Sequence, residues 1–193
     1  MSLLELIERA DERALAASAL ACLDRCLPLL AGPDGPEPLR PLWASCENGQ
    51  EWATRLTTVR TAMERASVPD GPAALVRAML GAAPSDFAAE PLREWADACS
   101  LVALRIHGRF DAPPGDTPRD EERLLKLARG GEPATVGPLV AGDLERQVRI
   151  LEILAETGGT AGSGAGLRKA LDLSTEGRRV LRAVMSRRAR GRG

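Results

Sequence analysis

The chain has 193 residues, of which 44% are hydrophobic, and a formal net charge of -1, so it is long enough to bury a globular core. No run approaches the ~18 uninterrupted apolar residues that a membrane span needs. At the N-terminus Glu5, Glu8 and Arg9 come before any apolar run of useful length, so we expect no secretory signal. We therefore expect a cytoplasmic protein without a membrane partner, whose four cysteines are reduced thiols.

Ala, Leu, Arg and Glu, which are strong helix formers, are abundant between breaks rich in glycine and proline. No stretch alternates apolar and polar residues with β-branched or aromatic enrichment, as a strand would. The expected helices cover residues 2–30, 39–48, 50–66, 73–81, 91–106, 119–129, 138–156, 167–173 and 175–190. The sequence therefore predicts an all-α protein of stacked antiparallel helices, an orthogonal or helical-repeat-like bundle, with a small C-terminal helical segment.

A glycine-rich stretch, GGTAGSGAG, follows the last long helix of the body. It does not fit a phosphate-binding loop, because Ala165 stands where such a loop needs lysine and no strand precedes it. We interpret residues 158–166 as a flexible linker between a helical body, residues 1–157, and a basic helical hairpin and tail, residues 167–193. Ser174 is the expected cap between the two helices of the hairpin.

Charge is distributed unevenly along the chain. Residues 166–193 carry nine basic and two acidic side chains, a local net charge of +7, so the total of -1 leaves -8 for residues 1–165. A basic end on an acidic body can contact nucleic acid or can dock on the body itself. The candidate nucleic-acid-binding residues are Arg178, Arg179, Arg182, Arg187 and Arg188.

Two cysteines, Cys22 and Cys26, lie four residues apart in the first long helix. A helical wheel places both on the side that carries the leucines, and it places charged residues on the opposite side: Arg13, Asp24 and Arg25. A structural zinc site needs further ligands, and no other cysteine or histidine is paired at ligand spacing. We therefore expect both thiols in the core, with no metal site and no cofactor.

No catalytic constellation is recognisable. His107, the only histidine, precedes Gly108 near the end of a predicted helix, where we expect it to act as a structural cap. Cys99 lies eight residues away, about 12 Å along a helix, so the two side chains cannot form a nucleophile pair within it. We therefore predict no catalytic residue and no enzyme.

Candidate partner-binding residues come from two features. Glu90, Glu94 and Asp97 share one face of a predicted helix and form an acidic surface that can receive a basic partner. Trp43 and Trp52 flank a polar, glycine-containing turn, and tryptophan is enriched where interfaces bind most tightly.

The segments ALAASALACLDRCLPLL and PLWASCENGQEW, separated by a proline-rich break, span about residues 13 to 60. This pattern resembles the start of some all-α immunity proteins of bacterial polymorphic toxin systems, which open with an Ala-rich helix ending in Leu-Pro and continue with a Trp-bearing helix. The resemblance implies a non-enzymatic protein that binds and blocks a toxin.

Together these features predict a non-enzymatic, cytoplasmic protein–protein interaction module of an immunity-like kind. The alternative is a helix-turn-helix-like regulator that binds nucleic acid through the basic C-terminal segment. An enzyme would need a pocket assembled from residues distant in sequence.

Overall fold

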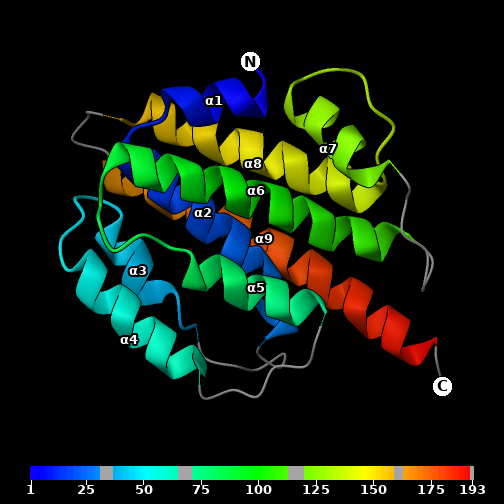
Figure 1. Ribbon diagram of the computed structural model, residues 1–193, viewed down its shortest axis with the longest axis horizontal. Coiled ribbons are helices and arrows are strands. Elements are labelled where there is room, and N and C mark those ends of the chain that lie inside the picture. Colours follow the sequence, from blue (N-terminus) through cyan, green and yellow to red (C-terminus); the bar gives the residue numbers. More distant parts are fainter. Residues whose placement is uncertain (31–36, 65–70, 113–119, 159–162, 192–193) are drawn as a thin grey trace.

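The structure is a computed structural model that describes residues 1–30, 37–64, 71–112, 120–158 and 163–191. In these ranges the chain forms helices and no strand, which confirms the predicted all-α fold (Figure 1). The helices are α1 (Leu3–Arg9), α2 (Glu12–Cys26), the short 3-10 helix η1 (Leu27–Leu29), α3 (Arg40–Ser45), α4 (Trp52–Glu64), α5 (Pro72–Gly81), α6 (Ala89–Asp111), α7 (Glu121–Arg129), α8 (Pro138–Glu156) and α9 (Ser163–Arg190).

Helix α2 is the centre of the protein. It packs against α6, α8 and α9, and every residue from Arg13 to Cys26 is buried. Its alanines lack bulk, so the three surrounding helices can approach its backbone closely. In Figure 1 α2 is partly hidden behind α6, with α8 and α9 running beside it.

The remaining helices cover the edges of this four-helix core. Helix α1 lies on α8 and α6, α7 lies on α6, and α5 contacts α6 and α2. Helices α3 and α4 pack on each other at one side of the molecule (Figure 1). An aromatic cluster joins this side to the core, because the Trp52 ring meets those of Phe87 and Trp95 edge-on at 5.4 and 5.9 Å between centroids.

Local signals explain where the first two helices begin. Ser2 and Glu5 form a capping box at α1, in which each side chain bonds the other residue's backbone N–H. The Asp11 side chain accepts a hydrogen bond from Ala14 N at the start of α2. Helix α8 has the bounds that the sequence predicts.

The C-terminal hairpin is not present, and its prediction from Ser174 is wrong. Helix α9 continues without a break from Ser163 to Arg190. Ser174 is buried in its middle, with its hydroxyl 2.8 Å from Asp24 Oδ2 and 3.2 Å from the Ala21 carbonyl oxygen. Because those acceptors come from α2, the serine needs no helix end to satisfy its hydroxyl. Of the predicted linker, residues 159–162 lie outside the described ranges, and the residues from 163 onward begin α9.

The charged side of α2 is also buried. The sequence separates Arg13, Asp24 and Arg25 from the cysteine-bearing side, but both sides are covered: the cysteines are buried as predicted, and Arg25 is 0% exposed. Helix α9 supplies much of this cover, since it packs along α2 and α8. The basic C-terminal helix therefore docks on the acidic body.

At Gly177, α9 lies close to a side chain of α2. A Cβ atom at this position would overlap Cδ of Arg25 and lie 3.2 Å from Cδ of Arg146. The missing side chain therefore makes room for the aliphatic stem of a buried arginine. The cost of a glycine inside a helix is offset by this packing.

We predict that Gly177→Ala lowers the free energy of unfolding by about 1–3 kcal/mol, because the added methyl group must displace the stem of Arg25. Urea denaturation measures the change. Gly164→Ala is the matched control on the same helix, since nothing lies within 4 Å of its Cβ position. If Gly177→Ala and Gly164→Ala change the free energy of unfolding equally, this account of the α2–α9 contact is wrong.

Candidate functional site

The interior holds a network of ion pairs centred on Arg25 and Asp143. Arg25 Nε lies 2.5 Å from Asp143 Oδ1, and both side chains are fully buried. The second oxygen of Asp143 accepts a hydrogen bond from Gln147 Nε2 at 2.8 Å. The pair therefore joins α2 to α8 with charge-assisted hydrogen bonds.

His107 faces this pair from α6. Its Nε2 lies 3.7 Å from Asp143 Oδ1, and its Nδ1 lies 2.8 Å from the Ala103 carbonyl oxygen, to which it donates. The prediction that His107 caps a helix C-terminus is wrong, because α6 continues to Asp111 and buries the imidazole.

The pKa shifts in this network indicate a structural role for its charged groups. Burial by itself would raise the pKa of Asp143, but the Arg25 charge, aided by His107 and Gln147, outweighs it and holds that pKa well below its ordinary value. Burial raises the pKa of the nearby Cys22 thiol to about 11. The carboxylate thus stays charged and the thiol stays neutral at physiological pH, so neither is poised to exchange protons.

A second cluster fastens α9 to α2. Arg178 bridges two carboxylates, with Nη1 3.1 Å from Asp24 and Nη2 2.9 Å from Glu37. Burial raises the pKa of Asp24 in spite of the opposing Arg178 charge. The hydrogen bond from Arg178 lowers the pKa of the half-exposed Glu37. Basic and acidic ends of the chain meet here.

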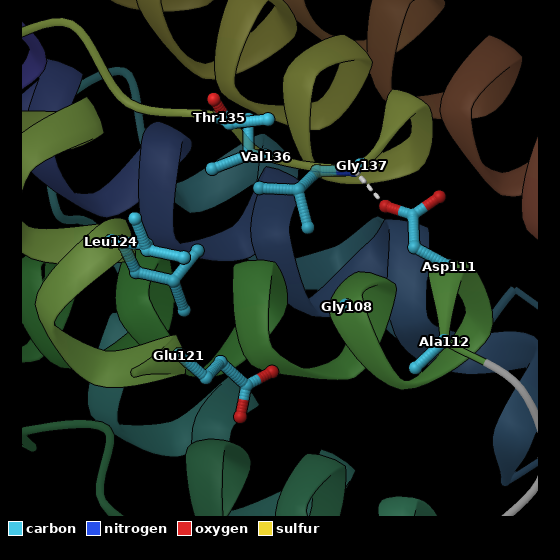
Figure 2. Close-up of a pocket in the computed structure, with 10 residues that line it drawn as sticks. Gly108, Asp111, Ala112, Glu121, Leu124, Thr135, Val136 and Gly137 are labelled. Carbon is cyan, nitrogen blue, oxygen red and sulfur yellow. Dashed lines mark hydrogen bonds between the residues drawn. The ribbon is translucent and has the colours of Figure 1, made fainter. Parts of the chain in front are cut away.

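A surface pocket of about 310 Å³ lies between α6, α7 and the start of α8 (Figure 2). Its lining is Gly108, Asp111, Ala112, Glu121, Leu124, Leu125, Thr135, Val136, Gly137 and Val140. Most of these side chains are aliphatic or absent, and two are carboxylates. It combines apolar walls with a few polar groups, as small binding sites do.

Asp111 builds one edge of the pocket. Its carboxylate accepts hydrogen bonds from Leu139 N and Val140 N, each at 3.0 Å, and so caps the first turn of α8. Gly137 permits this approach, because a Cβ atom there would overlap the carboxylate. Both oxygens of Asp111 are therefore occupied by the backbone of α8.

Glu121 builds the opposite edge, and its situation differs. Figure 2 shows its carboxylate reaching from the start of α7 toward α6. Oε1 lies 2.7 Å from the position that a Cβ of Gly108 would take, so the absence of a side chain there admits the carboxylate. This oxygen is buried and accepts no hydrogen bond from any residue that the structure describes.

The predicted partner-binding residues occupy different environments. Trp43 and Trp52 are only 6% and 1% exposed, and Trp52 Nε1 donates to the Pro84 carbonyl at 2.8 Å. Their contact with a partner stays a prediction, which this burial disfavours. Glu90 and Glu94 are exposed on α6, whereas Asp97 pairs with Arg129.

The five predicted nucleic-acid-binding arginines also differ in burial and in contacts. Arg178 is buried in its ion pairs, and Arg188 donates to the carbonyls of Phe110 and Ala112 at the end of α6, at 2.8 and 2.5 Å. Arg182 is partly buried, while Arg179 and Arg187 are exposed. Two of the five therefore serve the packing of α9.

Sequence reasoning missed the pocket and the buried network. Asp111 and Gly137 lie 26 positions apart, and Arg25 and Asp143 lie 118 apart, so no local spacing brings them together. The signals available in the sequence were the glycines at 108 and 137. At each of them a carboxylate occupies the space that a side chain would take.

We predict that Asp143→Asn lowers the free energy of unfolding at neutral pH by about 3–5 kcal/mol, because it leaves the charge of Arg25 buried without its partner. The folded pKa of Asp143 is depressed, so its contribution is present above the unfolded pKa of about 4 and is lost as pH falls through the folded pKa. The difference between the two proteins therefore shrinks on acidification.

Chemical denaturation at about pH 7 and about pH 3 measures both effects. Glu145→Gln, an exposed carboxylate on the same helix, is the control and should change little. A constant difference between wild type and Asp143→Asn at both pH values would show that the ion pair does not carry the effect.

Comparisons with known proteins give no relative. No protein-family model matches the chain, and neither a curated protein nor a solved structure matches it. Among the described residues, no three His, Cys, Asp or Glu side chains gather as metal ligands. No helix in that part of the chain is both long and apolar enough to cross a membrane.

Proposed function

We propose that this chain is a non-enzymatic protein of the cytoplasm that binds a basic protein partner, as an immunity protein binds a toxin. The observation that carries the proposal is the pair of exposed carboxylates on the first half of α6. Glu90 and Glu94 lie one turn apart, and neither pairs with a cation among the described residues. Like charges at this spacing repel each other, so a cationic partner relieves a cost that the free protein bears.

The disposition of the other ionisable groups supports a binding role. Asp143, His107 and Asp24 are buried and engaged with neighbouring side chains, where a substrate does not reach them. The charges left at the surface of the body are suited to steering a partner of opposite sign.

We predict that Glu90→Lys combined with Glu94→Lys weakens capture of the partner at least about tenfold, which corresponds to about 1.4 kcal/mol. Wild-type and variant chains are used as baits in lysate from the source cells, and the recovered protein is quantified. A control with Glu145→Lys and Glu156→Lys reverses two exposed charges on α8. Recovery should fall with added salt, since exposed charges are screened.

A basic protein captured by wild type and control but not by the α6 variant supports the proposal. Equal capture by all three chains, or capture of no protein in stoichiometric amount, overturns it.

Nucleic-acid binding through α9 is the second candidate. It rests on Arg179, Arg187 and Arg190, which are exposed on a stretch that contains no acidic residue from 177 to 191. If this candidate is correct, the chain binds duplex DNA at low salt with an affinity that falls steeply as salt rises. Arg179→Glu with Arg187→Glu then abolishes binding, whereas Arg168→Glu, near the other end of α9, has a smaller effect. Absence of binding at low salt rejects it.

A further inference from the structure

The pocket between α6 and α7 contains an acceptor without a donor. Glu121 Oε1 is buried and accepts no hydrogen bond from the described residues. A ligand cannot reach Oε1 itself, because the protein covers it. Glu121 is only partly buried, however, and lines the pocket, so an N–H donor that meets this carboxylate from the pocket side gains a charge-assisted hydrogen bond. Of the two carboxylates in the pocket, Asp111 has its oxygens occupied by backbone N–H groups. Glu121 is therefore the pocket carboxylate that remains for a ligand.

The walls around this oxygen define the rest of the ligand. Leu124, Leu125, Val136 and Val140 surround the pocket with aliphatic surface. A ligand that fits must carry an apolar stem along these walls and a cationic, hydrogen-bond-donating end toward Glu121. The volume of about 310 Å³ lies at the small end of ligand sites, which suits one long side chain better than a folded cofactor.

Arginine meets these requirements. Its three methylene groups cover apolar surface, and its guanidinium is more weakly hydrated than the ammonium of lysine, so it loses less on entering an apolar pocket. The neighbouring carboxylate of Glu122 is exposed and already lies 3.1 Å from Arg105 Nη2. The anion that remains for an incoming cation is therefore Glu121.

We propose that this pocket binds an arginine side chain of the basic protein partner, with Glu121 accepting from the guanidinium and the aliphatic walls covering the stem. This inference rests on the proposed function for the identity of the partner, but the cation site can be tested without that partner.

The probe is N-acetyl-arginine N′-methylamide, added to isotope-labelled full chain while backbone amide shifts are followed by NMR. The amides of Gly108 and Gly137 report on the pocket, because both residues line it. A single, partly exposed ion pair should give a Kd of about 1 mM. N-acetyl-citrulline N′-methylamide, which has the same shape without the charge, should bind at least about tenfold more weakly.

Glu121→Gln should weaken binding of the arginine probe at least about tenfold. Glu122→Gln, which removes the same charge one residue away, should leave it within about twofold. The Glu121→Gln variant should fold, because Oε1 accepts no hydrogen bond that would be lost. Its far-ultraviolet circular dichroism and its urea midpoint, which is expected to equal or exceed that of wild type, establish this.

Several results overturn the proposal. Equal binding of the citrulline probe shows an apolar pocket without cation recognition, and equal losses in the two variants show a general charge effect. No shift at any soluble probe concentration shows that the pocket does not take arginine. A concentration-dependent dimer that Glu121→Gln abolishes assigns the pocket to a second copy of this chain.

The experiments can reject either proposal without rejecting the other. If the wild-type chain captures a basic partner but the arginine probe does not bind, the pocket assignment falls and the proposed function stands. If the probe binds through Glu121 but no basic partner is captured, the cation site stands and the proposed function falls.

Discussion

The buried contact between Arg25 and Asp143 is the constraint on which the arrangement of the long helices depends. Separating a buried ion pair would leave two uncompensated charges, so the 2.5 Å contact fixes α2 and α8 relative to each other. Arg25 Nη1 has no hydrogen-bond partner among the described residues, so the contact with Asp143 is the main compensation for the arginine charge. Helix α6 is tied to the same pair by His107 and by the 3.4 Å hydrogen bond from Gln147 to the Ser100 carbonyl. Helix α9 packs against the Arg25 side chain at Gly177, since only a residue without a side chain leaves room for the aliphatic stem of this arginine.

This interior arrangement determines the surface pocket. The position of α6 on α8 brings Asp111 to the first turn of α8, where its carboxylate takes the place of a capping side chain that Gly137 lacks. The same helix presents Gly108 to Glu121, whose carboxylate could not lie there beside a larger residue. The shape of the pocket therefore depends on how α6 and α8 pack against each other. A change in the buried Arg25–Asp143 pair should alter that packing and, with it, the pocket.

The sequence predicts those features whose causes are local. Helix α8 lies between a glycine–proline start and a glycine-rich end, and both of its bounds were predicted. Cys22 and Cys26 were placed in the core by their position among leucines. Ser174 and His107 were misread, because each has a local role as a cap and the tertiary partners that replace that role lie 36 to 153 residues away. The candidate site was missed for the same reason, since Glu121 looks like any acidic residue at the start of a helix.

Asp143 and Glu121 illustrate how one chemical group serves two purposes in this fold. Both present a carboxylate oxygen that is removed from water. Asp143 pairs with Arg25 of the same chain, so folding balances its charge. The hydrogen bond between the two side chains stabilises the packing of α2 against α8. Glu121 has no such partner among the described residues, so its desolvation is a cost that folding leaves uncompensated. The Glu121 side chain is only partly buried and lines the surface pocket. Under our proposal, a cation of the partner balances the Glu121 charge from the pocket side, as Arg25 balances the charge of Asp143 in the core.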